Sequence, residues 1–517
     1  MNFMKSKKFK FGAAAVAFTL AVIAIIVVIN VIVSSLAQEF SWYFPMSKAT
    51  VYSISNETYK LIDTVGSDNK VTIYFLTDKE RLTSSSAASY NTSQSLWGMK
   101  NIYTLATSLE DRYDFISIDY INITSEPEKL AAVYGEKYID VYASTTFSAI
   151  NVIVKNETYL KDSDGKYIID TVTGEKIAET FIKTYTRNEF YSGDAKGYLN
   201  GFCGEFKLCS AILSVCTPAS KVYFLEGHGE KIGSGDYGSA AYLATLFADA
   251  GFEVSKIDLM NESIDLSDAG KGSPIIAVMF APQTDISVAN YGTRKSESEK
   301  LDEFIKTPGC SLMLFLDENK ASLDNLNALL DGYGISVENA KLKDSGAASL
   351  SVDGYTIAGD YKKSDIGDLI KNKSSKAVFK SSRVMTVNPE KGAYTIVGAP
   401  SSSSPDGKTS VKGGEIALAA ASKVKDGGFV FAFGSSGFAS GTNLYNSVYS
   451  NRDLLLASIK ASGREVLPLN VGIKSLDTGD LDITKAQADV WTLIVSVAIP
   501  LVVVAIGTVV YVRRRHS

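Results

Sequence analysis

Two long hydrophobic stretches flank a region in which hydrophobic and polar residues alternate. Residues 11–37 and 490–512 contain no charged residue and consist mainly of Ala, Val, Ile, Leu and Phe. Each stretch is long enough to cross a hydrocarbon core of roughly 30 Å as a helix. We therefore expect one transmembrane helix at 11–37 and a second at 490–512.

Positive charges at the outer side of each stretch predict its orientation. Lysines cluster in residues 1–10, and Arg513, Arg514 and Arg515 follow the second stretch. Because such clusters favour the cytoplasmic side, we expect cytoplasmic tails at 1–10 and 513–517. Ser35 and Ala37 could form a signal-peptidase site, but the apolar run exceeds that of a signal peptide and favours an uncleaved anchor.

The region between the stretches predicts two α/β domains, at 38–200 and 201–480, followed by a juxtamembrane linker at 481–489. In the first domain the pattern predicts a helix at 97–111 and strands at 71–76, 115–123, 149–159 and 165–171, the last two forming a pair. Residues 188–204 are rich in Gly and irregular, which places the domain junction there.

In the second domain, short apolar strands alternate with helices. The expected strands are 222–225, 252–257, 274–280 and 311–316, and the expected helices are 237–250, 295–306 and 323–331. This alternation is typical of a parallel sheet covered on both faces. Residues 341–391 are less regular; strands at 394–400 and 427–438 and a helix at 443–460 follow.

The charge balance limits the partners. The net charge is −5, and the four lysines of the first tail and three arginines of the second leave −12 for the residues between. An acidic domain of this kind does not favour nucleic acid or an anionic lipid surface.

The four cysteines are too few for a disulfide scaffold. A bridge between Cys203 and Cys209 is one alternative outside the cytoplasm, and buried free thiols are the preferred one. No Cys-x-x-Cys or histidine accompanies the cysteines, so we expect no metal site.

The most suggestive motif is Glu226-Gly227-His228-Gly229-Glu230, which follows the first strand of the second domain. Open α/β sheets place ligands at this edge. His228 is the only histidine between the hydrophobic stretches, so histidine-dependent catalysis there would require it. We prefer a structural or partner-contact role, in which the glycines form the turn and the imidazole fixes the loop; ligand binding and catalysis are the alternatives.

Three other motifs fail at a required position. A dinucleotide fingerprint would need Gly where Ile232 stands, a Walker A loop would need Gly at Ser402, and a hydrolase elbow would need Gly at Phe438. The sequence therefore predicts no catalytic residue and no cofactor.

Several sequence segments agree, in the same order, with one known protein family. They are VYSISNETYKLI, VTIYFLTD, INVIVK, SAILSVCTPASKVYFLEGHGE and SNRDLLLASI, followed by a terminal hydrophobic stretch and RRR. The chain in this respect resembles the GldG-type, gliding-motility-associated auxiliary proteins of ABC transport systems. The resemblance covers nearly the whole chain and implies a bacterial cell-membrane protein with an extracytoplasmic Rossmann-like, glutamine-amidotransferase-like module without an established nucleophile. The chain differs from the family pattern at Gly434-Ser435-Ser436, where relatives tend to have a Gly-Asp-Ser-like turn.

The resemblance also implies separate partners, an ABC permease and a cytoplasmic ATPase, with an envelope polysaccharide or surface protein as a further partner. We expect a non-enzymatic auxiliary subunit whose helices pack on the permease. Gliding itself is not transferred to this chain. The rival hypothesis is a cell-surface ectoenzyme or carbohydrate-binding receptor that uses the crevice around His228.

Overall fold

The computed structural model describes residues 51–476 and Arg513, except for short gaps at 67–68, 90–92, 160–165, 194–198, 231, 233–239, 271–272, 291, 319–322, 347–348, 373 and 407–414. Within these residues, no helix combines the length and hydrophobicity that a membrane span requires. The two predicted spans, 11–37 and 490–512, lie outside the described residues.

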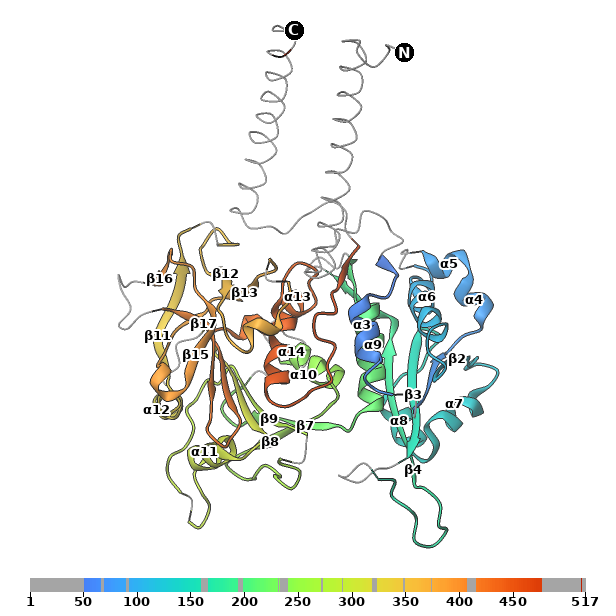
Figure 1. The fold of residues 1–517 in the computed structure, drawn as a ribbon, viewed down its shortest axis with the longest axis horizontal. Coiled ribbons are helices and arrows are strands. Elements are labelled where there is room, and N and C mark those ends of the chain that lie inside the picture. The colour runs from blue at the N-terminus through green and yellow to red at the C-terminus, as the bar shows by residue number, and fades with distance from the viewer. Residues whose placement is uncertain are drawn as a thin grey trace, which may run out of the picture.

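The first part of the chain folds around a four-stranded sheet in the order β2-β1-β3-β4 (Figure 1). Its strands are β1 (Lys70–Phe75), β2 (Ile116–Tyr120), β3 (Asn151–Tyr159) and β4 (Ala178–Thr186). β1 and β2 are parallel, whereas β3 is antiparallel to both β1 and β4. The prediction that 165–171 pairs with 149–159 is therefore wrong. The actual partner, β4, contains Lys183 and several threonines, so its hydrophobic pattern is weak.

Helices cover both faces of this sheet. The helices in this part are α3 (Asn56–Ile62), α4 (Lys79–Thr83), α5 (Ser85–Ala88), α6 (Met99–Glu110), α7 (Pro127–Tyr134) and α8 (Tyr138–Ser144), with short 3-10 turns η2 (Gly135–Lys137) and η3 (Arg187–Phe190). One core contains residues of α6 together with Val152 and Val154 of β3. The opposite core contains residues of α7 together with Ile153. Successive side chains of β3 therefore point alternately into the two cores.

The second part of the chain forms a twelve-stranded mixed sheet. Its parallel half has the order β8-β7-β9-β10-β18 and comprises β7 (Ser220–Glu226), β8 (Phe252–Asp258), β9 (Ile275–Phe280), β10 (Cys310–Phe315) and β18 (Phe429–Phe433). The predicted parallel strands at 222–225, 252–257, 274–280 and 311–316 are confirmed in this half.

The other half is antiparallel, which the sequence did not predict. It contains β11 (Ile335–Asp344), β12 (Thr356–Tyr361), β13 (Ala377–Lys380), β14 (Arg383–Val387), β15 (Ala393–Gly398), β16 (Ser403–Pro405) and β17 (Ala417–Lys423). Short 3-10 turns η4 (Gly367–Leu369) and η5 (Pro389–Lys391) connect some of them. The expectation that residues 341–391 are less regular is therefore wrong, because they contain β12, β13 and β14.

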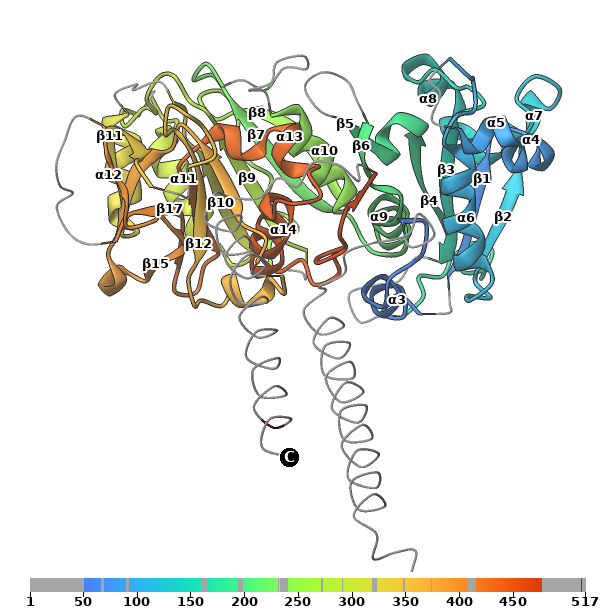
Figure 2. The same ribbon diagram turned by 90° about the horizontal axis from the view of Figure 1, so that it is seen from above.

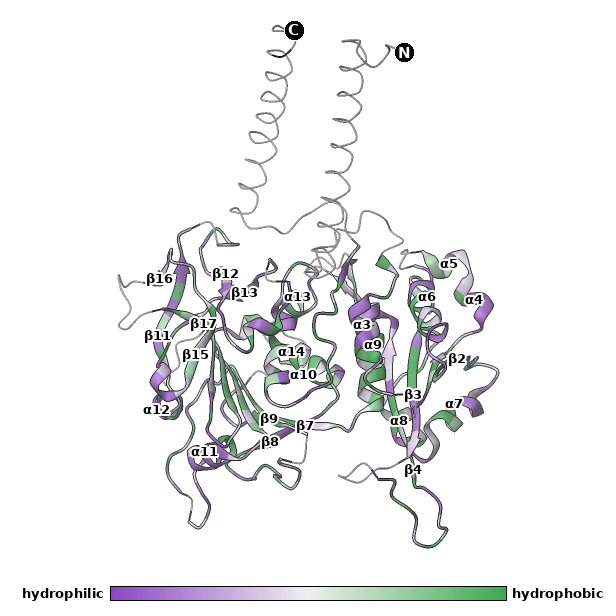
Figure 3. Ribbon diagram, viewed as in Figure 1, coloured by the Kyte–Doolittle hydropathy of each residue, from purple (hydrophilic) through white to green (hydrophobic). Residues whose placement is uncertain are grey.

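As expected, β9 and β10 at the centre of the parallel half are buried on both faces, whereas most of the edge strand β8 is exposed. The helices on these faces are α10 (Ala241–Asp249), α11 (Glu297–Lys306), α12 (Asp324–Gly332), α13 (Gly441–Leu444) and α14 (Asn451–Ala461), with the 3-10 turn η6 (Ser436–Ala439). Along β9, Ile276, Val278 and Phe280 face one core, while Ile275, Ala277 and Met279 face the other. Figure 3 shows the resulting contrast between hydrophobic central strands and the polar helix α11.

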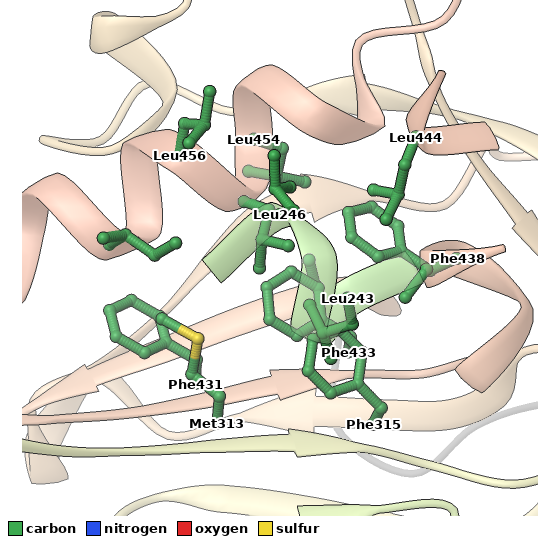
Figure 4. Packing of buried hydrophobic residues seen from close by; sticks show 14 of the residues in the cluster. Leu243, Leu246, Met313, Phe315, Phe431, Phe433, Phe438, Leu444, Leu454 and Leu456 are labelled. Carbon is green, nitrogen blue, oxygen red and sulfur yellow. The ribbon is translucent and has the colours of Figure 1, made fainter. Parts of the chain in front are cut away.

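The first of these cores contains a stack of aromatic rings. Phe315 of β10 and Phe433 of β18 have ring centroids 4.6 Å apart and an interplanar angle of 6°. Phe438 packs on Phe433, and leucines from α10, α13 and α14 close over the rings (Figure 4). This packing holds the parallel half against the last helices of the described chain.

Helix α9 (Gly204–Cys216) lies between the two parts (Figure 2). Leu208, Ala211 and Ile212 belong to the core of the four-stranded sheet, whereas Phe206 and Cys209 belong to the core of the larger sheet. Nearly every residue of α9 is buried, including the charged Glu205 and Lys207. A small antiparallel sheet consists of β5 (Tyr191–Gly193), β6 (Leu199–Phe202) and β19 (Lys474–Ser475). Because β6 comes directly before α9 in the chain, the pairing of β19 with β6 places the end of the described chain near the start of α9.

Candidate functional site

The turn after β7 has the backbone geometry that its glycines predict. Gly227 has φ of 117° and Gly229 has φ of 74°, both in the region that favours glycine. Between them, the His228 N–H donates to Glu230 Oε2 at 2.7 Å. The His228 carbonyl accepts hydrogen bonds from the Gln283 and Thr284 N–H groups, at 2.7 and 3.1 Å. The backbone therefore fastens this turn to the loop that follows β9.

The imidazole of His228 lies between two carboxylates. Its Nδ1 is 2.9 Å from Glu230 Oε1, and its Nε2 is 3.1 Å from Glu297 Oε1. His228 is only 4% exposed, and both carboxylate side chains are buried. Glu297 lies in the first turn of α11 and also accepts the Ser287 N–H at 2.9 Å.

This environment holds the imidazole in its charged form. Burial alone would lower the pKa of His228, but the hydrogen bonds and negative charges of Glu230 and Glu297 outweigh burial and raise it to about 10. Burial would raise the pKa of Glu297, yet His228 and the Ser287 N–H lower it overall. At neutral pH both ring nitrogens therefore donate hydrogen bonds, and neither is free to accept a proton.

The remaining residues of the motif differ in position. Glu226 and Gly227 are exposed, and a Cβ at Gly227 would lie 3.4 Å from Asp258 Oδ1 at the end of the neighbouring strand β8. The structure thus buries the side chains of His228 and Glu230 in the turn and leaves Glu226, Gly227 and Gly229 exposed. Glu297 could not be identified from the sequence, because it is 69 residues from His228 and lies in an ordinary amphipathic helix.

A second polar group lies at the same edge of the sheet and was also missed. Gln283 Nε2 donates to Asp317, which follows β10, and to the carbonyl oxygen of Ala281 at 2.7 Å. Ala281 has φ of 54°, a strained value for a residue with a Cβ. Burial lowers the pKa of Arg383 in β14, and the negative charge of Asp317 opposes that shift. These groups satisfy one another and fix the loops at the carboxyl edge.

Both ring nitrogens of His228 thus face carboxylates, and we call the imidazole with Glu230 and Glu297 the His228 lock. A protonated imidazole with both nitrogens engaged is not a general base and not a metal ligand. Across the described ranges, no three His, Cys, Asp or Glu side chains are grouped so that they could hold a metal ion.

The comparisons with known proteins give little further information. No family model matches the sequence, and no curated protein matches it. One solved structure with some similarity is described as the mmIFT52 N-terminal domain; it is 15% identical, covers 47% of this chain and 97% of its own, and superposes with a TM-score of 0.36.

Proposed function

We propose that this protein is a membrane-anchored, non-catalytic auxiliary subunit of a bacterial ABC-type transport system. The basis is the resemblance to GldG-type proteins, in which a Rossmann-like, glutamine-amidotransferase-like module stands outside the membrane. Its partners would be an ABC permease and a cytoplasmic ATPase. The predicted helices at 11–37 and 490–512 would pack on the permease, while the α/β domains would contact substrate or envelope.

One observation carries the proposal: a single buried carboxylate holds both ends of the described chain. Glu205 Oε1 accepts hydrogen bonds from the Ser55 N–H and the Thr58 hydroxyl, each at 2.7 Å. Glu205 Oε2 lies 2.9 Å from Lys474 Nζ. Lys474 also donates to the Ser53 carbonyl oxygen, so the two ends contact each other directly.

This arrangement suits a subunit that transmits movement. The segment around Ser55 follows the first predicted span, and the segment around Lys474 precedes the second. Glu205 is 2% exposed and belongs to the first turn of α9, the helix that packs in both cores. A displacement of either end would therefore act on the helix that joins the two α/β parts.

The state of His228 supports the non-catalytic part of the proposal. Its imidazole is buried, charged and bound at both nitrogens. A receptor or ectoenzyme of the rival kind would need that ring to face a ligand. No observation in the described residues favours the rival function.

The proposal is tested by purifying the tagged full chain from its native membranes in mild detergent and identifying the co-purified proteins by mass spectrometry. We expect a polytopic permease and an ATPase in stoichiometric amounts. Recovery of the chain alone, under conditions that preserve a known ABC complex, would overturn the proposal.

A variant then tests the role of the two joined ends. Glu205→Gln keeps the size of the side chain but removes the charge that faces Lys474. We expect the complex to assemble and its ATP hydrolysis to fall, whereas Glu253→Gln, at an exposed position of β8, serves as the matched control and leaves hydrolysis unchanged. Equal hydrolysis in both variants would contradict coupling through Glu205.

A further inference from the structure

A surface cavity of about 440 Å³ lies beside α11, away from the buried His228 lock. Its walls come from the turn after β8, from the segment before α11 and from one side of that helix. Its lining includes Ser263, Ile264, Leu266, Thr293, Arg294 and Phe304. Small-molecule sites in proteins typically begin at roughly 300 Å³, so the cavity is large enough for one.

The wall formed by the turn after β8 is held in place. The Asp258 carboxylate accepts the Met260 N–H at 2.9 Å and the Asn261 side-chain amide at 2.6 Å. Lys300 of α11 donates to the carbonyl oxygens of Leu259 and Glu262, the latter at 2.8 Å. The cavity is thus a fixed feature between a strand end and a helix.

Its lining divides into an apolar part and a cationic part. Leu259 and Phe304 are buried beneath the surface, and Leu266 remains 38% exposed beside them. Lys295 is paired with Glu303 and Lys300 is bound to the two carbonyl oxygens, so the charges of these two lysines already have partners. Arg294 differs, because its exposed guanidinium makes no hydrogen bond or ion pair with the described residues.

Two hydroxyl groups add to the polar side. The side chains of Ser263 and Thr293 line the cavity and are exposed, and neither forms a hydrogen bond within the described residues. A guanidinium with nearby hydroxyl donors matches the geometry of carboxylate, sulfonate or phosphate oxygens. The local positive charge also contrasts with the acidic balance of the chain, whose net charge is −5.

We infer that this cavity binds a small amphipathic anion: an apolar body packs on Ile264 and Leu266, and its anionic group pairs with Arg294. This inference concerns a site that the proposed function does not use, so either can fail without the other. The cavity and the His228 lock share α11, which carries both Phe304 and Glu297, but no residue of the lock lines the cavity.

The test uses two fluorinated probes that share one apolar ring. The anionic probe is 4-(trifluoromethyl)benzoate, and the neutral probe is 4-(trifluoromethyl)benzyl alcohol. Their binding to the full chain in lipid nanodiscs is measured by ¹⁹F NMR titration, with empty nanodiscs as the blank. We expect the anion to bind at one saturable site and more tightly than the alcohol.

Three variants assign the site. Arg294→Gln should weaken the benzoate about fivefold, the size expected of an exposed ion pair, and leave the alcohol unchanged. Leu266→Ser should weaken both probes, since it removes part of the apolar wall. Arg81→Gln, at an exposed position of α4, removes the same charge elsewhere and should change neither. Absence of saturable binding, or equal benzoate affinity in the two arginine variants, would overturn the inference.

Discussion

Lys207 and Asp249 form an ion pair in the interior, with Nζ and Oδ2 2.7 Å apart and both side chains 2% exposed. The pair joins α9 to the last residue of α10, and Tyr445 donates a further hydrogen bond to the same carboxylate oxygen at 3.3 Å. The Lys207 ammonium also lies 5.2 Å from the ring centre of Tyr185. A charge pair therefore crosses the contact between the two α/β parts.

Removing one charge of this pair should be costly. Asp249→Asn leaves the Lys207 ammonium buried without its counter-ion, and we expect the free energy of unfolding to fall by about 3–5 kcal/mol. The measurement is denaturant unfolding followed by tryptophan fluorescence. Asp268→Asn is the matched control, because that carboxylate pairs with Lys221 at the surface and its loss should cost about 1 kcal/mol or less. Similar losses in both variants would contradict this account of the buried pair.

The His228 lock predicts a pH dependence with a definite sign. The pKa of His228 is raised from 6.5 to about 10 in the folded protein, so its contribution is fully present below about pH 6.5 and disappears as the pH rises toward 10. The pKa of Glu297 is lowered below 4.5, so its contribution is present above that value and is lost as the pH falls.

We therefore expect His228→Gln to reduce the free energy of unfolding by about 2–4 kcal/mol near pH 6. The difference from the wild type should shrink between pH 7 and 10. Denaturant unfolding of both proteins at matched pH values provides the measurement. A difference that stays constant over this range would show that the imidazolium charge is not what stabilises the turn.

The thiols should be free and unreactive in the folded chain. All four cysteines are unpaired in the structure, which decides against the alternative of a Cys203–Cys209 bridge. Burial raises the pKa of the Cys203 thiol to about 11 and that of Cys216 to about 12. Iodoacetamide at pH 8 should add to none of them within minutes, and to all four in denaturant, as read by intact mass. Fewer than four additions in denaturant without reductant would instead indicate a disulfide.

The centre of the parallel half could be predicted from the sequence because β9 and β10 are hydrophobic on both faces. IIAVMF in β9 is a short uninterrupted apolar run, CSLMLF in β10 is interrupted only by Ser311, and every residue in both strands is buried. The antiparallel half lacks this signal. β17 reads ALAAASK, with little intrinsic preference for a strand, and β11 reads ISVENAKLKD, with polar residues throughout. Tertiary pairing specifies these strands more than local pattern does.

Only some residues of the candidate site could likewise be predicted from the sequence. The turn residues of the His228 motif could be found, because two glycines flank a histidine after a predicted strand. Glu297 could not, because nothing in the amphipathic pattern of α11 distinguishes a carboxylate that faces the sheet from one that faces solvent. The Glu205–Lys474 contact joins residues separated by more than half of the described chain, so it depends on the fold and not on spacing.

Close packing where β18 meets β10 gives a last prediction. A Cβ on Gly428 would lie 1.7 Å from the carbonyl oxygen of Cys310 and 2.9 Å from Ser311 Oγ. The Gly428 N–H donates to the Ile305 carbonyl oxygen at 3.1 Å, so this segment cannot move away without losing a hydrogen bond. Gly428→Ala should therefore lower the free energy of unfolding by about 2–3 kcal/mol or more.

Gly332→Ala is the control for this variant. Nothing lies within 4 Å of a Cβ at Gly332, at the exposed end of α12, so the change should be neutral or stabilise by up to about 1 kcal/mol. If thermal and denaturant unfolding gave the two variants equal stability, the close approach of β18 to β10 would be wrong.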